Sequence, residues 1–177
     1  CTDGGLDMGI VGHEYTHAIS NRMIAGPDDS INSEQGGAMG ESWSDLTAAE
    51  YMFANNYSNG GNVWAVGAYA TGNLDVAIRD YAINHNPLNY SDYGFDLTGP
   101  EVHADGEIWN GTQWSVRQAL VSKWNAQFPA GNEALQQKCA EGKGQTPPLP
   151  VTSCPGNRRW IQLVFDAYLL QQGDTSM

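Results

Sequence analysis

The string Gly12-His13-Glu14-Tyr15-Thr16-His17, near the start of the chain, is the feature that most constrains its fold. Two histidines four residues apart lie one turn above each other on an α-helix. The rings of His13 and His17 can therefore present nitrogens to one metal ion. Glu14 lies about 100° round the helix from His13, beside such an ion and not under it. The spacing predicts a helix that carries a metal site.

This set of residues is typical of zinc hydrolases. A zinc ion held in this way lowers the pKa of its bound water to about 7, and the neighbouring glutamate takes the proton. His13 and His17 are thus candidate zinc ligands, and Glu14 is the candidate general base. The alternative is that the two stacked histidines are hydrogen-bonded core residues of a buried helix, and the motif alone does not exclude this.

A catalytic zinc ion with two histidine ligands needs a third protein ligand. In the His₂Glu arrangement a second helix supplies a carboxylate, and a fourth position stays open for water. Glu41 opens the next helical segment and is the candidate third ligand. Asp45 lies one turn further along the same face, where it can accept the free ring N–H of a ligating histidine and fix its tautomer. Alternatively, both are ordinary acidic residues near a helix N-terminus, where the helix dipole favours them.

Four segments of the chain resemble the fungalysin family of secreted zinc metalloendopeptidases, itself similar to the wider thermolysin-like group. They are residues 9–22, which contain both histidines, residues 36–45, which end in ESWSD, and the shorter segments 99–103 and 158–160. In that group two histidines and a downstream glutamate bind zinc. The resemblance implies an endopeptidase that hydrolyses internal bonds of protein or peptide substrates outside the cell.

The resemblance also implies roles for Arg79 and His103. Arg79 resembles an arginine that thermolysin-like enzymes use to hold a substrate carbonyl; its alternative is a surface salt bridge. His103 comes just before a long helical run, where a thermolysin-like histidine stabilises the oxyanion of the tetrahedral intermediate. A polarised donor there strengthens as charge develops, which is what accelerates a reaction. The alternative for His103 is a helix-start residue with no catalytic duty.

The totals of the sequence indicate a folded, acidic protein. A hydrophobic fraction of 41% and six tryptophans predict a core, and 177 residues suit a single domain, residues 1–177. The net charge of −12 argues against nucleic-acid binding, because no basic stripe faces phosphates. The sequence has no run of eighteen apolar residues, so no membrane-spanning helix is predicted.

The chain is expected to be part of a larger catalytic domain. The metal-binding helix starts almost at residue 1, and residues 173–176 offer helix-capping side chains just as the chain stops. The resemblance implies a β-rich lobe upstream, which forms the other wall of the cleft, and a further helix downstream. That lobe or a propeptide is then an expected partner. The loop between His17 and Glu41 is slightly shorter than expected for fungal members, which suggests a bacterial relative.

The hydrophobic pattern and the resemblance together predict a mainly α chain with long irregular loops, the helical C-terminal part of a thermolysin-like catalytic domain. The predicted helices cover residues 6–23, 41–55, 105–123, 133–140 and 158–172. The first has apolar residues round most of its circumference, so we expect it to be buried on nearly all sides. Residues 63–70 are ambiguous between a strand and a short helix, and residues 77–99 are predicted to be irregular.

The three cysteines fit an oxidising compartment. A bond between Cys139 and Cys154 would close a loop of about fifteen residues and stabilise the fold by about 3 kcal/mol in the chain-entropy model. Cys1 is then left over, either free or paired with an upstream portion. The alternative is three reduced cysteines in a cytosolic protein.

One zinc ion per chain is the predicted cofactor. Calcium is a weaker candidate: the acidic residues Asp28, Asp29, Asp92 and Asp96 could bind it, but nothing matches a calcium-loop spacing. The competing functional hypothesis is a zinc-binding helical module with little or no catalysis of its own, because the lobe that binds an extended substrate is absent. A structural zinc site, however, is usually closed by four protein ligands and has no use for Glu14.

Overall fold

The computed structural model describes residues 2–57, 61–97, 99–140 and 148–177. Every regular element in these ranges is a helix, which confirms the predicted mainly α fold. The α-helices are α1 (Met8–Met23), α2 (Glu34–Ala54), α3 (Ala68–Thr71), α4 (Val102–Trp124), α5 (Glu133–Cys139) and α6 (Gly156–Tyr168). Four short 3₁₀ helices lie between them, namely η1 (Gly4–Leu6), η2 (Ile83–His85), η3 (Tyr90–Asp92) and η4 (Val151–Ser153).

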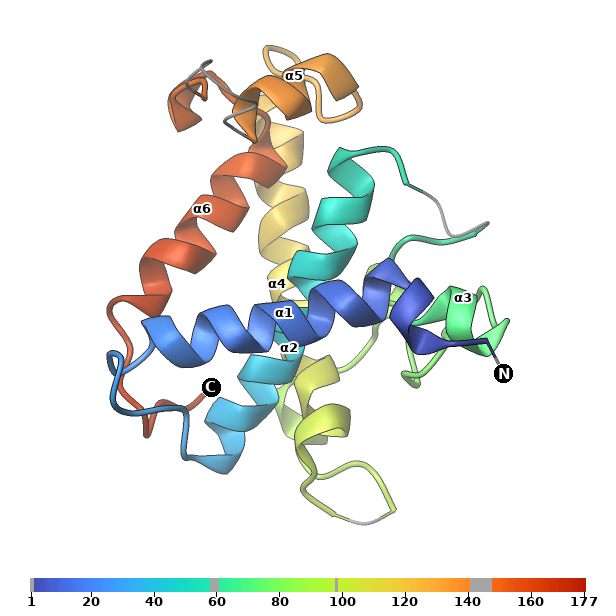
Figure 1. Ribbon diagram of the computed structural model, residues 1–177, viewed down its shortest axis with the longest axis vertical. Coiled ribbons are helices and arrows are strands. Elements are labelled where there is room, and N and C mark those ends of the chain that lie inside the picture. The colour runs from blue at the N-terminus through green and yellow to red at the C-terminus, as the bar shows by residue number, and fades with distance from the viewer. Residues whose placement is uncertain (1, 58–60, 98, 141–147) are drawn as a thin grey trace.

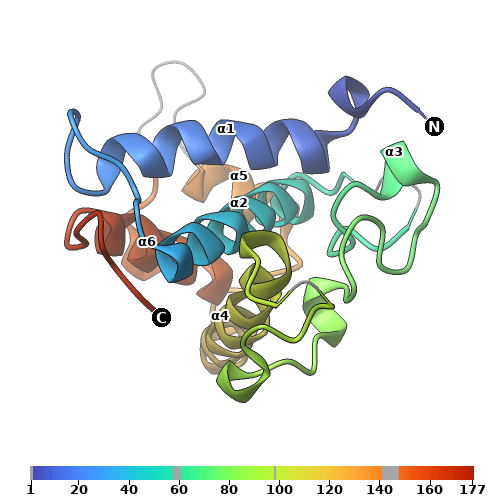
Figure 2. The same ribbon diagram turned by 90° about the horizontal axis from the view of Figure 1, so that it is seen from below.

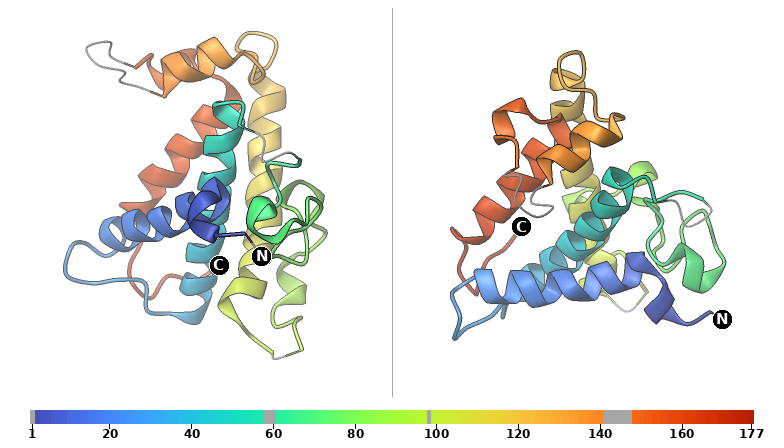
Figure 3. Two further views of the ribbon diagram at one scale, coloured as in Figure 1. Left: turned by 45° about the vertical axis from the view of Figure 1, so that its right-hand side comes forward. Right: turned by 45° about the horizontal axis from the view of Figure 1, so that its top comes forward.

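Helix α2 is the centre of the fold. It packs against α1 and against α4, and α6 packs against α4. Figure 1 shows α1 crossing in front of α2, and Figure 2 shows α1 as a layer along one side of the molecule with α2 next to it. In Figure 3 the loops that follow α2 and the short α3 lie beside the N-terminal end of α1, whereas α5 lies at the opposite end of α4 from these loops.

Two helices begin earlier than the sequence pattern predicted. Helix α2 begins at Glu34 and not at residue 41, because Ser33 caps it by accepting the backbone N–H of Gly36 at 3.0 Å. The glycine-containing residues 36–40 therefore belong to the helix and do not precede it. Helix α4 begins at Val102 and not at residue 105, because the Glu101 carboxylate accepts two backbone N–H groups of its first turn.

Helix α1 is not buried on nearly all sides, so that prediction is wrong. Its buried face consists of small and polar residues that include Gly12 and His13, whereas Val11 is 42% and Tyr15 is 69% exposed. The close approach of α2 explains this, because a Cβ at Gly12 would lie only 3.1 Å from the Cβ of Ala48. The helices meet there through small side chains, whereas Val11 and Tyr15 face solvent.

The remaining predicted boundaries differ less. Helix α6 ends at Tyr168, four residues before the predicted end, and α5 matches its prediction to within one residue. Residues 63–70 hold turns and the start of α3 instead of a strand. Residues 77–99 are irregular apart from η2 and η3, as predicted for the described part of that segment.

The core lies between α2, α4 and α6. Trp43 of α2 and Tyr168 of α6 meet edge to face at a ring-centroid distance of 5.0 Å. The buried apolar cluster around them comprises Ile24, Met39, Trp43, Leu46, Ala49, Trp64, Val66, Ile83, Trp160, Val164 and Tyr168. Trp43, Leu46 and Ala49 of α2 belong to this cluster, and the partly buried Phe53 packs against it. None of the helices in the described ranges is both long enough and apolar enough to span a bilayer.

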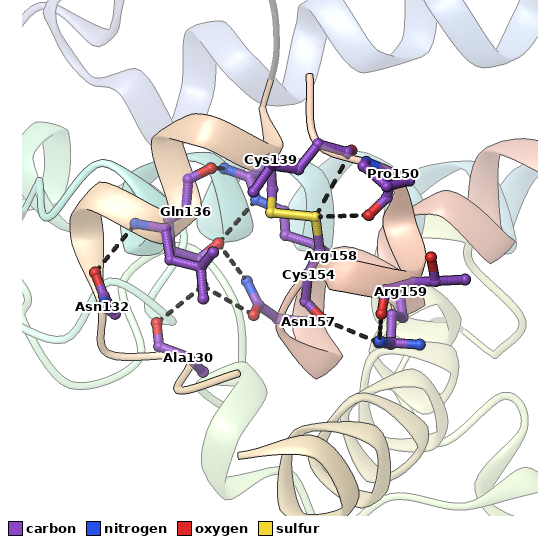
Figure 4. The surroundings of a disulfide bond; sticks show 12 residues. Ala130, Asn132, Gln136, Cys139, Pro150, Cys154, Asn157, Arg158 and Arg159 are labelled. Carbon is purple, nitrogen blue, oxygen red and sulfur yellow. Dashed lines mark hydrogen bonds between the residues drawn. A yellow bond between two sulfur atoms is a disulfide. The ribbon is translucent and has the colours of Figure 1, made fainter. Parts of the chain in front are cut away.

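A disulfide joins Cys139 at the end of α5 to Cys154 just before α6, as Figure 4 shows. The predicted pairing is therefore confirmed, and Cys1 lies outside the described residues. Next to the disulfide, the amides of Gln136 and Asn157 bond each other in both directions, at 2.9 and 3.1 Å. The pair of bonds and the disulfide together hold α5 against the start of α6.

A buried ion pair continues this polar contact toward the centre of the fold. Asn157 donates to Glu50 of α2 at 2.5 Å, and Glu50 accepts from the Nε of Arg117 in α4 at 2.6 Å. The guanidinium of Arg117 lies over the rings of Phe53 and Trp64 at 4.7 and 4.5 Å from their centroids. Helices α2, α4, α5 and α6 are thus connected away from the candidate site.

We expect the double replacement Cys139→Ser and Cys154→Ser to lower the free energy of unfolding by about 3 kcal/mol, because the open chain gains loop entropy in the unfolded state. Urea titration of the oxidised wild type and the double variant measures the difference. The reduced wild type is the matched control and should behave like the variant. Equal midpoints for the oxidised wild type and the variant would contradict the prediction.

Candidate metal centre

Helices α1 and α2 bring His13, His17 and Glu41 together. The Nε2 atoms of the two histidines are 3.0 Å apart, and Glu41 places Oε2 at 3.3 Å from His13 and Oε1 at 3.2 Å from His17. A tetrahedral zinc ion with bonds of about 2.0 to 2.1 Å separates neighbouring ligand atoms by about 3.3 Å. These three separations, which involve one nitrogen of each histidine and both oxygens of Glu41, are close to the spacing of neighbouring ligand atoms around one zinc ion. Within the described ranges, these three residues form the one group of histidine, cysteine or acidic side chains suited to hold a metal ion.

Asp45 determines which nitrogen of His13 faces the other ligands. The Asp45 carboxylate lies 2.8 Å from Nδ1 of His13, and a carboxylate only accepts hydrogen bonds when ionised. The Nδ1 atom therefore carries a proton, so the lone pair of the neutral ring is on Nε2. That is the tautomer that binds a metal ion through Nε2.

The electrostatics of the cluster favour a positive charge between the ligands. Burial alone would lower the pKa of His13, but hydrogen bonds to Asp45 and Glu41 raise that pKa to about 9. Burial also opposes ionisation of Glu41, yet hydrogen bonds from His13 and His17 hold the pKa of its carboxyl far below the usual range. The site thus attracts a proton or a metal cation strongly.

Arg79 is buried behind the cluster. Its side chain is 7% exposed, and its guanidinium binds Asp45 through Nε at 2.8 Å and Nη2 at 3.0 Å. The Nη2 atom also lies 3.2 Å from Oε2 of Glu41. Burial tends to raise the pKa of Asp45, but the charge of Arg79 holds it below its ordinary value. Arg79 is therefore not a surface salt bridge, and its guanidinium contacts both acidic residues of α2.

His103 lies at the edge of the same cluster, inside the first turn of α4 rather than before it. Its Nε2 is 3.6 Å from Oε2 of Glu41, and its side chain is 57% exposed. Its Nδ1 is 2.5 Å from the Glu101 carboxylate, which also caps α4. The ring is thus oriented by the same residue that starts the helix, with Nε2 toward the candidate metal ligands.

Glu14 follows His13 on α1 and is exposed. By the helical period the side chain of Glu14 projects about 100° round the helix from the imidazole of His13. A side chain in this position can approach a substrate from solvent while the two histidines face α2.

The comparisons with known proteins agree on one family. A family model described as fungalysin metallopeptidase (M36) matches residues 1–177. The chain belongs to the fungalysin metallopeptidase family. The extracellular metalloproteinase mep of Aspergillus terreus is 35% identical over 127 residues, which cover 68% of this chain and 19% of that protein. Extracellular metalloproteinase 3 of Trichophyton soudanense is 33% identical over 132 residues, 72% of this chain and 33% of that protein.

A third fungal relative, extracellular metalloproteinase 4 of Arthroderma otae, is 40% identical over 114 residues, covering 60% of this chain and 17% of that protein. No solved structure matches the chain. The fungalysin chain spans 19% of the length of the Aspergillus terreus relative and 33% of the length of the Trichophyton soudanense relative. That residues 1–177 form one domain of a longer catalytic unit stays a prediction.

The three relatives named above are fungal proteins, which contradicts the expectation of a bacterial relative. That expectation rested on the short loop between His17 and Glu41. Loops tolerate insertions and deletions of a few residues, because they carry few of the contacts that hold a fold together. The length of this loop is therefore a poor guide to relationship.

Three further residues of α4, which the sequence did not single out, contribute to the candidate site. Gly106 lets α4 approach α2, because a Cβ there would lie 2.8 Å from the backbone oxygen of Ala38 and 3.0 Å from Glu41 Cβ. Glu107 and Asn110 follow His103 by four and seven residues, so they lie on the same face of the helix. The sequence shows this helical spacing after His103. It does not show which residues Glu107 and Asn110 contact, because those residues lie far away in the chain.

Glu107 anchors the segment that carries Arg79. Its two carboxylate oxygens accept the backbone N–H groups of Asp80 and Tyr81, both at 2.9 Å. The side chain is buried, and burial raises the pKa of Glu107 to about 7. Arg79 is thereby fixed to α4 on one side and to Asp45 of α2 on the other.

The raised pKa of Glu107 predicts a pH-dependent stability. The folded protein holds this proton more tightly than the unfolded chain, where the pKa is near 4.5. The stabilisation that protonation provides is therefore complete below about pH 4.5 and is lost as the pH rises through about 7. As the pH rises from about 4.5 to about 7, the wild type should lose stability relative to Glu107→Gln, which has no carboxyl to ionise at this position. Urea titration of both proteins across this pH range measures the difference in free energy of unfolding. A difference that stays constant with pH would contradict the prediction.

Proposed function

We propose that this chain carries the active centre of a zinc endopeptidase, with one zinc ion held by His13, His17 and Glu41. The observation that supports it most is that the two Nε2 atoms lie 3.0 Å apart and each lies 3.2 to 3.3 Å from an oxygen of Glu41. A structural site would need a fourth protein ligand, whereas this cluster in the described residues has three. A bound zinc ion supplies a Lewis acid for the scissile carbonyl and lowers the pKa of the attacking water.

Glu14 acts as the general base in this proposal. It takes the proton of the attacking water and passes it to the leaving amine, so one carboxylate serves both halves of the reaction. Its exposure supports the role, because the substrate must reach it from solvent. Asp45 keeps Nε2 of His13 available by accepting at Nδ1.

His103 and Arg79 bind the developing charge and the substrate. His103 donates from Nε2 to the oxyanion, while the carboxylate of Glu101 contacts Nδ1 and orients the ring. In Arg79, Nε and Nη2 contact Asp45 and Glu41, so we assign Nη1 to a substrate carbonyl. The buried guanidinium is already oriented, which lowers the entropy cost of binding.

We further propose that the substrates are proteins or peptides and that the protein works outside the cell. The relatives carry the name extracellular metalloproteinase, and a disulfide joins Cys139 to Cys154. The rest of the catalytic unit, with the β-rich lobe, is proposed to form the other wall of the cleft. The exposed Val11 and Tyr15 on α1, beside Glu14, support a partner on this face.

The second candidate is a zinc-binding helical module without catalysis of its own. The observation in its favour is the small share of the relatives that the chain covers, 19% of the first. If this candidate is correct, the chain binds one zinc ion but does not cleave peptides.

Replacing Glu14 by Gln should lower kcat/KM about 100- to 10,000-fold, the usual contribution of a general base, while zinc stays bound. Hydrolysis of a quenched fluorescent peptide by the zinc-loaded chain, with zinc content measured on the same samples, checks this. Glu133→Gln is the matched control, because it changes an exposed glutamate of α5 away from the cluster.

The outcomes separate the two candidates. Cleavage that a chelator abolishes and that Glu14→Gln removes at full zinc content supports the endopeptidase. A wild-type chain that binds one zinc ion and cleaves nothing supports the module. Full activity in Glu14→Gln would overturn the role of Glu14, and a folded chain without zinc would overturn both candidates.

A further inference from the structure

We propose that Asn110 of α4 is a positioning residue for the metal centre, which it affects through Asp45. Asn110 is fully buried, and its Nδ2 donates to Oδ2 of Asp45 at 3.0 Å. Its Oδ1 accepts from the hydroxyl of Ser42 at 2.8 Å. One side chain of α4 thus bonds two residues of α2, Ser42 directly after Glu41 and Asp45 one turn further along. This inference rests on the proposed zinc site.

The orientation of the Asn110 amide follows from its two partners. An ionised carboxylate can only accept, so the group that faces Asp45 must be the NH₂. The opposite oxygen then faces Ser42, whose hydroxyl can donate. The reverse orientation would place the amide oxygen against Asp45 and leave two buried oxygens in repulsion, which is costly in a low-dielectric interior.

Asn110 completes the set of donors around Asp45. Oδ1 of Asp45 lies 2.8 Å from Nδ1 of His13 and accepts Nη2 of Arg79 at 3.0 Å. Oδ2 accepts Nε of Arg79 at 2.8 Å and the amide of Asn110. Each oxygen therefore has two donors, the number that its lone pairs allow. Without Asn110, Oδ2 keeps a single donor.

Asn110 affects His13 because it is the donor to Asp45 Oδ2 that comes from a packed helix. Arg79 comes from an irregular segment, whereas Asn110 stands on a long helix packed against α2. A fixed donor on Oδ2 holds the plane of the carboxylate, and this plane sets where Oδ1 meets Nδ1 of His13. Loss of Asn110 allows the carboxylate to tilt, and the ring of His13 then loses part of its orientation toward the metal.

Asn157 provides a matched control elsewhere in the fold. It too is fully buried, and it too donates its side-chain amide to a carboxylate of α2, in this case Glu50. Its network leads to Gln136 and to the disulfide, away from the metal ligands. Truncation of either asparagine removes a buried amide of the same size, so both should destabilise the fold.

The experiment measures the dissociation constant for zinc by competition with a chromophoric chelator, together with the melting temperature. In Asn110→Ala the zinc dissociation constant should rise about tenfold, within the range for residues that orient metal ligands. In Asn157→Ala it should stay within about twofold of the wild type, although the melting temperature falls. An unchanged zinc affinity in Asn110→Ala, or an equal loss in both variants, overturns the proposal.

A second pair of variants covers the case in which the alanine variants do not fold. Leucine has nearly the shape of asparagine, so Asn110→Leu and Asn157→Leu fill the same space without hydrogen bonds. The same contrast in zinc affinity is expected. Equal affinities for the two leucine variants would overturn the proposal.

A double-mutant cycle tests whether Asn110 acts through Asp45. Asp45→Ala should weaken zinc binding about 10- to 100-fold, and Asn110→Ala should add no further loss in that background. Additive losses would overturn the proposed route. If the proposed zinc site is wrong, the wild type will not bind one zinc ion per chain. If only the role of Asn110 is wrong, the wild type will still bind zinc tightly.

Discussion

The buried carboxylate of Asp45 is the interaction on which the rest of the site depends. A charge that is 1% exposed is costly to bury without partners, by several kcal/mol, so the fold must bring donors to it. The donors come from three separate parts of the chain: His13 of α1, Arg79 of the irregular segment and Asn110 of α4. Satisfying this one carboxylate therefore fixes the arrangement of the elements around α2.

Close packing makes that convergence possible. Gly12 allows α1 to approach α2 near Ala48, and Gly106 allows α4 to approach α2 at Glu41. Helix α2 thus presents the candidate ligand Glu41 between two helices, with the buried carboxylate of Asp45 one turn further along. The second buried ion pair, between Glu50 and Arg117, anchors the far half of α2. The ligands are therefore mounted on rigid elements, which is what precise metal geometry requires.

The sequence predicted the parts of the site that depend on helical periodicity. The spacing of His13 and His17 and of Glu41 and Asp45 places each pair on one face, and the structure brings all four together. It could not predict the contacts of Asn110, because they join residues far apart in the chain and depend on the packing of α2 and α4. The starts of the two helices have a local cause instead: Ser33 caps α2 before the glycines of residues 36–40, and Glu101 caps α4.

The most direct test of the zinc site is X-ray absorption at the zinc K-edge on the purified chain, combined with its zinc content. The account predicts one zinc ion per chain and a first shell of two imidazole nitrogens and carboxylate or water oxygens, at about 2.0 to 2.2 Å and without sulfur. The scattering from the outer atoms of the imidazole rings should weaken when His17 is replaced by Ala, because only the ring of His13 then remains at the zinc ion. A folded chain without stoichiometric zinc, or a first shell that contains sulfur, would contradict the assignment of His13, His17 and Glu41.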